Sequence, residues 1–124
     1  MPKPKSKKRQ QQIKHRPDGG IILIDVPLGD TTVEIYMRPL LWNDQIATSD
    51  QERVKEVDPE ALDPACVLLS RLVDKWQVKG EKARDSISAL ELHEDPVKYN
   101  DVMRVTNSAI ARFLVVVDEF VEVE

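Results

Sequence analysis

The sequence has few of the residue types on which metal sites and active sites depend. Cys66 is the single cysteine among 124 residues, which excludes an internal disulfide and indicates a reducing compartment. The two histidines, His15 and His93, are far apart in the chain, whereas a zinc site takes three or four close ligands. None of the four glycines belongs to a phosphate-binding loop. We therefore expect no metal, no cofactor and no enzyme activity.

Long apolar runs are also missing. The first apolar run, Ile21–Val26, is short, contains Asp25 and is stopped by Pro27, which does not fit a secretory signal. No later stretch approaches the ~20 consecutive apolar residues of a membrane span. We expect a cytoplasmic protein that does not enter a membrane.

Cys66 and His93 each allow a chemical and a structural interpretation. A cysteine nucleophile needs a neighbouring base or cation that lowers its pKa, but Cys66 adjoins the apolar stripe of a predicted helix, which favours burial. His93 lies among Glu91, Glu94 and Asp95, a weak candidate for cation binding. We interpret that cluster as a solvated loop between helices.

The charges are unevenly distributed along the chain. Residues 1–16 contain seven Lys and Arg and no acid, whereas residues 17–124 contain the other 11 Lys and Arg and all 22 acids. Ile13 is the only large apolar residue after Met1 in the basic segment, which therefore cannot offset its ordering entropy. With turn residues at 17–20 as the boundary, we predict a disordered basic arm over residues 1–19 and one folded domain over 20–124.

The basic arm is a candidate for contact with a polyanion such as nucleic acid or an acidic protein surface. It contains no aromatic side chain that would stack on bases. A solubilising tail, or an arm that lies on its own acidic domain, stay open as alternatives. The cations concerned are Lys3, Lys5, Lys7, Lys8, Arg9, Lys14 and Arg16.

Residues 21–37 predict a β-hairpin. Thr31–Met37 alternates between two faces in β-forming residues, and a turn with Gly29 separates it from the apolar run that precedes it. A hairpin alone is marginally stable in water, so it must pack on the rest of the domain.

Four helices are predicted after the hairpin, at about residues 41–47, 64–76, 86–92 and 96–118. Asp63 and Asp95 each precede a proline, a typical helix start. An apolar stripe at helical spacing runs from Ala65 to Trp76, and the polar residues 48–63 are expected to form a loop. The predicted fold class is α+β, with the hairpin packed on a small, mostly helical bundle.

Trp42 and Trp76 both fall on apolar faces, so core packing is the ordinary interpretation of each. Trp42 also ends the cluster Arg38-Pro39-Leu40-Leu41-Trp42 at the junction of strand and helix. If this cluster is exposed, it is a candidate partner-binding patch, with Arg38, Leu40, Leu41 and Trp42 as contacts.

In their order along the chain, these features resemble the tail assembly chaperones of long-tailed bacteriophages and prophages. The stretch Val33–Trp42, in which a strand leads into Arg-Pro-Leu, one residue and then Trp, is similar to the opening of that family. A helix ending in Leu72–Trp76, a short helix with Ala89–Leu92 and a closing amphipathic helix follow. The similarity covers roughly residues 20–118, and the basic arm departs from it, as does Leu41, where the family often has a small or capping residue.

The resemblance implies a role without catalysis, in the cytoplasm of a bacterial host. Such proteins bind the long helical tape measure protein, keep it soluble, help recruit major tail tube protein subunits around it, and are usually absent from the finished virion. A longer product of ribosomal frameshifting often accompanies them. The alternative is a nucleic-acid-associated structural or regulatory protein that acts through the basic arm.

Overall fold

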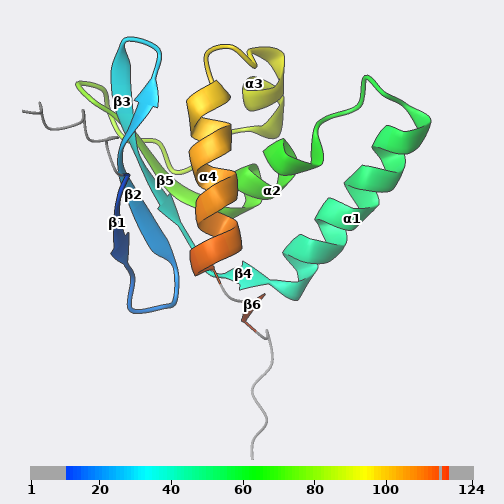
Figure 1. The fold of residues 1–124 in the computed structure, drawn as a ribbon, viewed down its shortest axis with the longest axis horizontal. Coiled ribbons are helices and arrows are strands. Elements are labelled where there is room, and N and C mark those ends of the chain that lie inside the picture. The colour runs from blue at the N-terminus through cyan, green and yellow to red at the C-terminus, as the bar shows by residue number, and fades with distance from the viewer. Residues whose placement is uncertain (1–10, 115, 118–124) are drawn as a thin grey trace, which may run out of the picture.

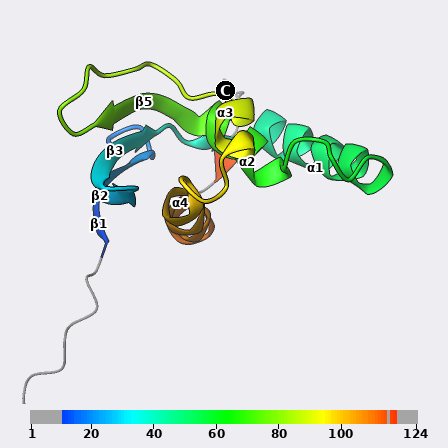
Figure 2. The ribbon, with the colours of Figure 1, turned by 90° about the horizontal axis from the view of Figure 1, so that it is seen from above.

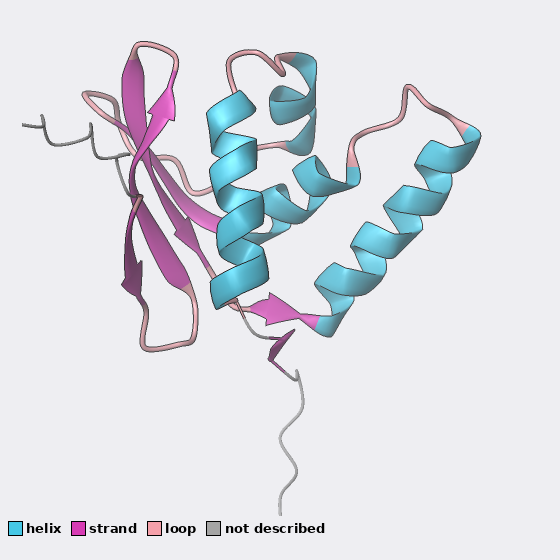
Figure 3. Ribbon diagram, viewed as in Figure 1, coloured by secondary structure: helices cyan, strands magenta, loops and turns pink. Residues whose placement is uncertain are grey.

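The computed structural model describes residues 11–114 and 116–117 of the chain. Strands β1 (Gln12–His15), β2 (Ile21–Leu28), β3 (Thr31–Met37) and β5 (Val73–Val78) form an antiparallel sheet in the order β1-β2-β3-β5. Helix α4 (Asn100–Phe113) packs against β2, and α2 (Pro64–Leu72) and α3 (Ala89–Glu94) lie beside α4 (Figures 1 and 2). The α+β class is confirmed, and Figure 3 shows the division into strands and helices.

The predicted hairpin of residues 21–37 is confirmed. Strands β2 and β3 pair with Leu28 opposite Thr31, and Gly29 in the turn between them has a φ of 58°, which glycine adopts without steric cost. Ile21, Leu23, Val33, Ile35 and Met37 are buried on one face of the sheet. This face forms the floor of the hydrophobic core.

Two bulges shift the pairing of the strands, one between β2 and β3 and the other between β3 and β5. In β2 the pairing passes from Leu23 to Val26 while β3 advances by two residues, and Asp25 has a φ of 54°. The extra residue turns Val26 back toward the core. A second shift between Tyr36 and Met37 lets Val73 and Trp76 of β5 both lie buried.

The predicted disordered arm is wrong for its last residues. Gln12–His15 form β1, which pairs along β2 from Gln12 opposite Ile24 to His15 opposite Ile21, and Pro17–Gly20 turn the chain between them. The strand is stabilised by pairing with β2 rather than by its own composition, since Ile13 alone packs on the core. Residues 1–10 of the predicted arm lie outside the described residues.

The first helix is much longer than predicted. Helix α1 covers Trp42–Val57, so residues 48–57 are helical rather than a loop. These residues contain no glycine or proline, and Glu, Lys, Arg and Gln are good helix formers. Two short strands, β4 (Leu40–Leu41) and β6 (Val116–Val117), pair in parallel beside the start of this helix.

The second predicted helix ends early, because α2 stops at Leu72 and Val73 begins β5. Asp63 caps α2 as predicted, with its carboxylate accepting a hydrogen bond from the Ala65 N–H at 2.9 Å. The third helix, α3, runs from Ala89 to Glu94 rather than from 86 to 92 and is capped by Ser88, so Glu91, His93 and Glu94 are helical rather than part of a loop. The fourth, α4, runs from Asn100 to Phe113 rather than from 96 to 118, and Leu114 follows in extended conformation before β6.

Candidate partner-binding surface

Helix α1 presents its apolar side chains to solvent. Trp42 is 53% exposed, Ile46 55%, Val54 49% and Val57 88%. At 3.6 residues per turn, positions 42, 46, 54 and 57 fall on one side of the helix. We call these four residues the α1 stripe. An ion pair between Asp50 and Arg53, at 3.6 Å, crosses the stripe between its two apolar ends.

The opposite side of α1 packs on the protein although it is mostly polar. Asp44 is the buried residue of this helix, and Gln45, Thr48, Gln51 and Lys55 are half-buried. The Gln51 amide donates to the Leu62 carbonyl at 2.8 Å, and the Lys55 ammonium donates to the Ala61 carbonyl at 3.3 Å. The usual amphipathic arrangement is therefore reversed, with polar groups inside and apolar groups outside.

Helix α1 contacts α2 and β4, and it lies on the outside of the molecule away from the sheet (Figures 1 and 2). Its length leaves the C-terminal half of the stripe beyond the core. A monomeric protein usually buries such a face, so an apolar stripe on an outer helix indicates an interaction surface.

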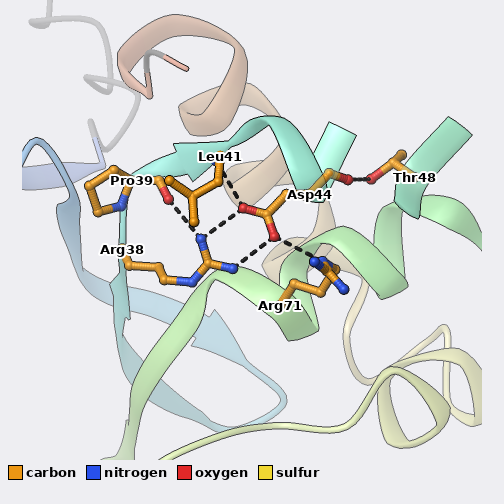
Figure 4. Close-up of polar contacts among 6 residues, drawn as sticks. All are labelled: Arg38, Pro39, Leu41, Asp44, Thr48 and Arg71. Carbon is orange, nitrogen blue, oxygen red and sulfur yellow. Dashed lines mark hydrogen bonds and ion pairs between the residues drawn. The ribbon is translucent and has the colours of Figure 1, made fainter. Parts of the chain in front are cut away.

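The base of α1 is held by a buried carboxylate. The guanidinium of Arg38, at the end of β3, donates to both oxygens of Asp44 at 2.7 and 2.8 Å, and Arg71 of α2 donates through Nε at 2.8 Å (Figure 4). The Leu41 N–H donates to the same carboxylate at 2.9 Å, which satisfies a free N–H at the helix start. One side chain therefore ties α1 to the sheet and to α2.

The electrostatics of this contact favour the ionised carboxylate. Burial alone raises the pKa of Asp44. The hydrogen bonds from Arg38, from the Leu41 N–H and from Arg71 lower this pKa by more than burial raises it, and the net value is about 2. Asp44 therefore stays charged at neutral pH, and the orientation of α1 is fixed by paired charges.

The four predicted contact residues are brought together at this junction, but they do not share one surface. Leu40 is buried in the core, Leu41 is half-buried in β4, and Arg38 is bound to Asp44. Trp42 is exposed, so its interpretation as a core residue is wrong, whereas Trp76 is only 2% exposed and is a core residue as predicted. Of the four predicted contacts, Trp42 belongs to the α1 stripe.

Ile46, Val54 and Val57 were not among the predicted contacts. Val54 and Val57 lie in the predicted loop of residues 48–63, so the helical face that they share with Trp42 and Ile46 of the predicted helix was not recognised. A helical projection of residues 42–57 would have grouped them with Trp42.

The predicted polyanion contacts are divided by the fold. Arg16 forms ion pairs with Asp18 and Asp74, each at 2.8 Å, and Lys14 lies on β1. The other five cations of the arm, Lys3, Lys5, Lys7, Lys8 and Arg9, lie outside the described residues. In the described part of the chain the arm therefore contributes to the sheet edge.

The candidates for catalysis and for cation binding, Cys66 and the cluster around His93, make contacts within the protein. Cys66 is buried, and this burial raises the pKa of its thiol. Glu91 binds Arg84 at 2.9 Å and accepts a hydrogen bond from the Tyr99 hydroxyl at 3.1 Å, while His93 accepts a 3.4 Å hydrogen bond from the Asp63 N–H. Within residues 11–114 and 116–117, no group of three His, Cys, Asp or Glu is placed to hold a metal ion, and no helix is long and apolar enough to cross a membrane.

No protein-family model, curated protein or solved structure matches the chain.

Proposed function

We propose that this protein is a tail assembly chaperone that binds the tape measure protein during phage tail morphogenesis, in the cytoplasm of the host. The observation that carries the proposal is the α1 stripe, an apolar face on an outer helix. The complex would keep the long helical partner soluble and would present it to major tail tube protein subunits.

The form of the stripe suits a helical partner. Its two apolar ends, Trp42 with Ile46 and Val54 with Val57, are separated by the Asp50–Arg53 ion pair. A partner helix laid across α1 would contact both ends with apolar side chains and would meet polar groups between them.

The expected strength of the contact suits a temporary complex. Complete burial of a large apolar side chain stabilises a complex by about 1.5–3 kcal/mol, and Trp42, Ile46 and Val54 are already about half covered. Association also costs several kcal/mol in lost freedom of motion. A single stripe therefore holds a partner that tube subunits can later displace.

The charge of the chain supports the same role. Residues 17–124 contain twice as many acids as Lys and Arg, 22 against 11. Like-charge repulsion between copies limits association through the exposed stripe. The chain is thereby able to expose apolar surface without precipitating.

The proposal is tested by co-expression with the tape measure protein, which we expect to be encoded as a very long helical reading frame next to this gene. Wild-type chain should increase the soluble fraction of that partner and should co-purify with it. The double variant Ile46→Ser and Val57→Ser should lose both effects with an unchanged circular dichroism spectrum. Val97→Ser is the matched control, because Val97 is an exposed valine, 87% accessible, in the turn between α3 and α4.

The alternative, a nucleic-acid-associated protein, is tested with the purified chain and a variant that lacks residues 1–10. Deletion of residues 1–10 leaves β1 intact, whereas a longer deletion would remove part of the sheet. Binding of duplex DNA that disappears with this deletion and weakens steeply with salt would support the alternative. Capture of the helical partner should be unaffected by the deletion.

A further inference from the structure

A groove runs between the edge strand β1 and helix α4. It contains an open cavity of about 500 Å³, with Ile13, Leu23, Val105 and Ala109 among its apolar lining residues. The His15 ring meets the Phe113 ring edge to face at 5.7 Å where α4 ends. The groove is remote from α1 in the fold (Figure 1), so it is independent of the proposed function.

Cations line the helix side of this groove. Arg104, Ser108 and Arg112 follow one another at intervals of four residues along α4 and all line the cavity. Arg104 forms an ion pair with Asp101 at 2.8 Å, and the guanidinium of Arg112 lies 5.3 Å from the centre of the Phe113 ring. Among the described residues, no carboxylate forms an ion pair with Arg112.

The strand side of the groove offers backbone hydrogen-bonding groups. Strand β1 is at the edge of the sheet and pairs with β2 on one side. An edge strand presents N–H and C=O groups to which an extended segment adds as a further strand. The ligand that fits is therefore an extended peptide with apolar and acidic side chains.

We propose that this groove binds the chain's own acidic segment, residues 118–124. That segment reads DEFVEVE, with four carboxylates and with Phe120, Val121 and Val123 as β-forming apolar residues. Its acids are complementary to Arg104 and Arg112, and its apolar residues are complementary to the groove floor.

The segment is long enough for this contact. It begins five residues after Phe113, which lines the groove. Seven extended residues span up to about 23 Å, whereas the helix rises about 12 Å between Arg104 and Arg112. Seven extended residues are therefore longer than the distance between Arg104 and Arg112 along the groove.

Disulfide trapping in the full chain tests the proposal. The double variant Ser108→Cys and Val121→Cys places one thiol in the groove and one in the segment, while Cys66 is retained because it is buried. The control pairs Val121→Cys with Asn107→Cys, because Asn107 is exposed on α4 but does not line the cavity. Non-reducing gels and peptide mass mapping identify the bond, and circular dichroism checks the fold.

The expected result is a monomeric cross-link between positions 108 and 121 that forms at least about tenfold faster than the one from position 107, because docking raises the effective concentration of the thiols. Adding Arg112→Glu to the double variant, or raising the salt concentration, should slow the cross-linking between positions 108 and 121, whereas adding Arg112→Lys should leave its rate unchanged. Equal rates from positions 107 and 108 would overturn the proposal. A dimeric cross-link instead of a monomeric one would also overturn it, by assigning the groove to the segment of a second copy.

Discussion

Arg38 and Asp44 form a bidentate ion pair, with nitrogen–oxygen distances of 2.7 and 2.8 Å, at the point where the sheet passes into α1. The carboxylate is completely buried, and Arg71 approaches it from a third element. The Arg-Pro junction that looked like a surface motif in the sequence is therefore the support that holds α1 against α2. The Arg38–Asp44 pair thereby fixes the position of the α1 stripe relative to the sheet and to α2.

The Asp44→Asn variant should destabilise the protein by about 2–4 kcal/mol, because it leaves two arginines facing a neutral group in a partly buried site. Chemical denaturation measures the loss in the free energy of unfolding. Asp50→Asn is the control, since its exposed pair with Arg53 should contribute under about 1 kcal/mol. Equal effects of the two substitutions would show that Asp44 does not hold α1.

The stability should fall as the pH drops from about 5 toward 2. The pKa of Asp44 is lowered from 3.8 to about 2 in the folded state, so its contribution is complete above the unfolded pKa and is lost as the pH falls through the folded pKa. A shift of this size corresponds to about 2.5 kcal/mol. Unfolding curves between pH 5 and 2 should show a smaller pH dependence for Asp44→Asn than for the wild-type chain; identical slopes would contradict this assignment.

Gly20→Ala should destabilise the protein by about 1–3 kcal/mol. A Cβ atom at Gly20 would collide with the backbone carbonyl oxygen of Met37, across the pairing of β2 and β3. Backbone cannot move aside as a flexible side chain does, so the start of β2 must shift. Gly80 lies in an open turn with a φ of 82°, where an added Cβ would meet no neighbouring atom. Gly80→Ala therefore measures the cost of the backbone conformation alone, without a steric collision. Thermal unfolding should show a larger loss of stability for Gly20→Ala than for Gly80→Ala.

The two tryptophans should differ in their access to solvent. Trp42 is 53% exposed and Trp76 is 2% exposed, so iodide should quench one fraction of the fluorescence and spare the other. Trp42→Phe should remove the accessible fraction, and partner binding should protect Trp42 and shift its emission to shorter wavelength. Quenching that persists in Trp42→Phe would place Trp76 at the surface and contradict the fold.

The hairpin was predictable because Thr31–Met37 alternates strictly, but the element that contains Trp76 was not. The bulge opposite Tyr36 and Met37 places Val73 and Trp76, three residues apart, on the same face, and this spacing imitates a helical stripe. Strand β1 was missed because its stability comes from pairing with β2, a tertiary effect that local composition does not report.

The candidate surface was only partly predictable for a related reason. Trp42 was identified from its position after Arg38-Pro39, but the remaining stripe residues lie in a helix whose packed side is polar. Helix prediction from apolar periodicity assumes that the apolar side faces the core. A helix such as α1, which is held by Asp44 and by polar contacts with the loop after it, violates that assumption.

Capture of the tape measure protein by the α1 stripe is measured by the soluble yield of that partner on co-expression. Ile46→Ser with Val57→Ser should reduce the yield to the level without chaperone, while Val97→Ser should retain the wild-type yield. Wild-type yield with the folded double variant would contradict it.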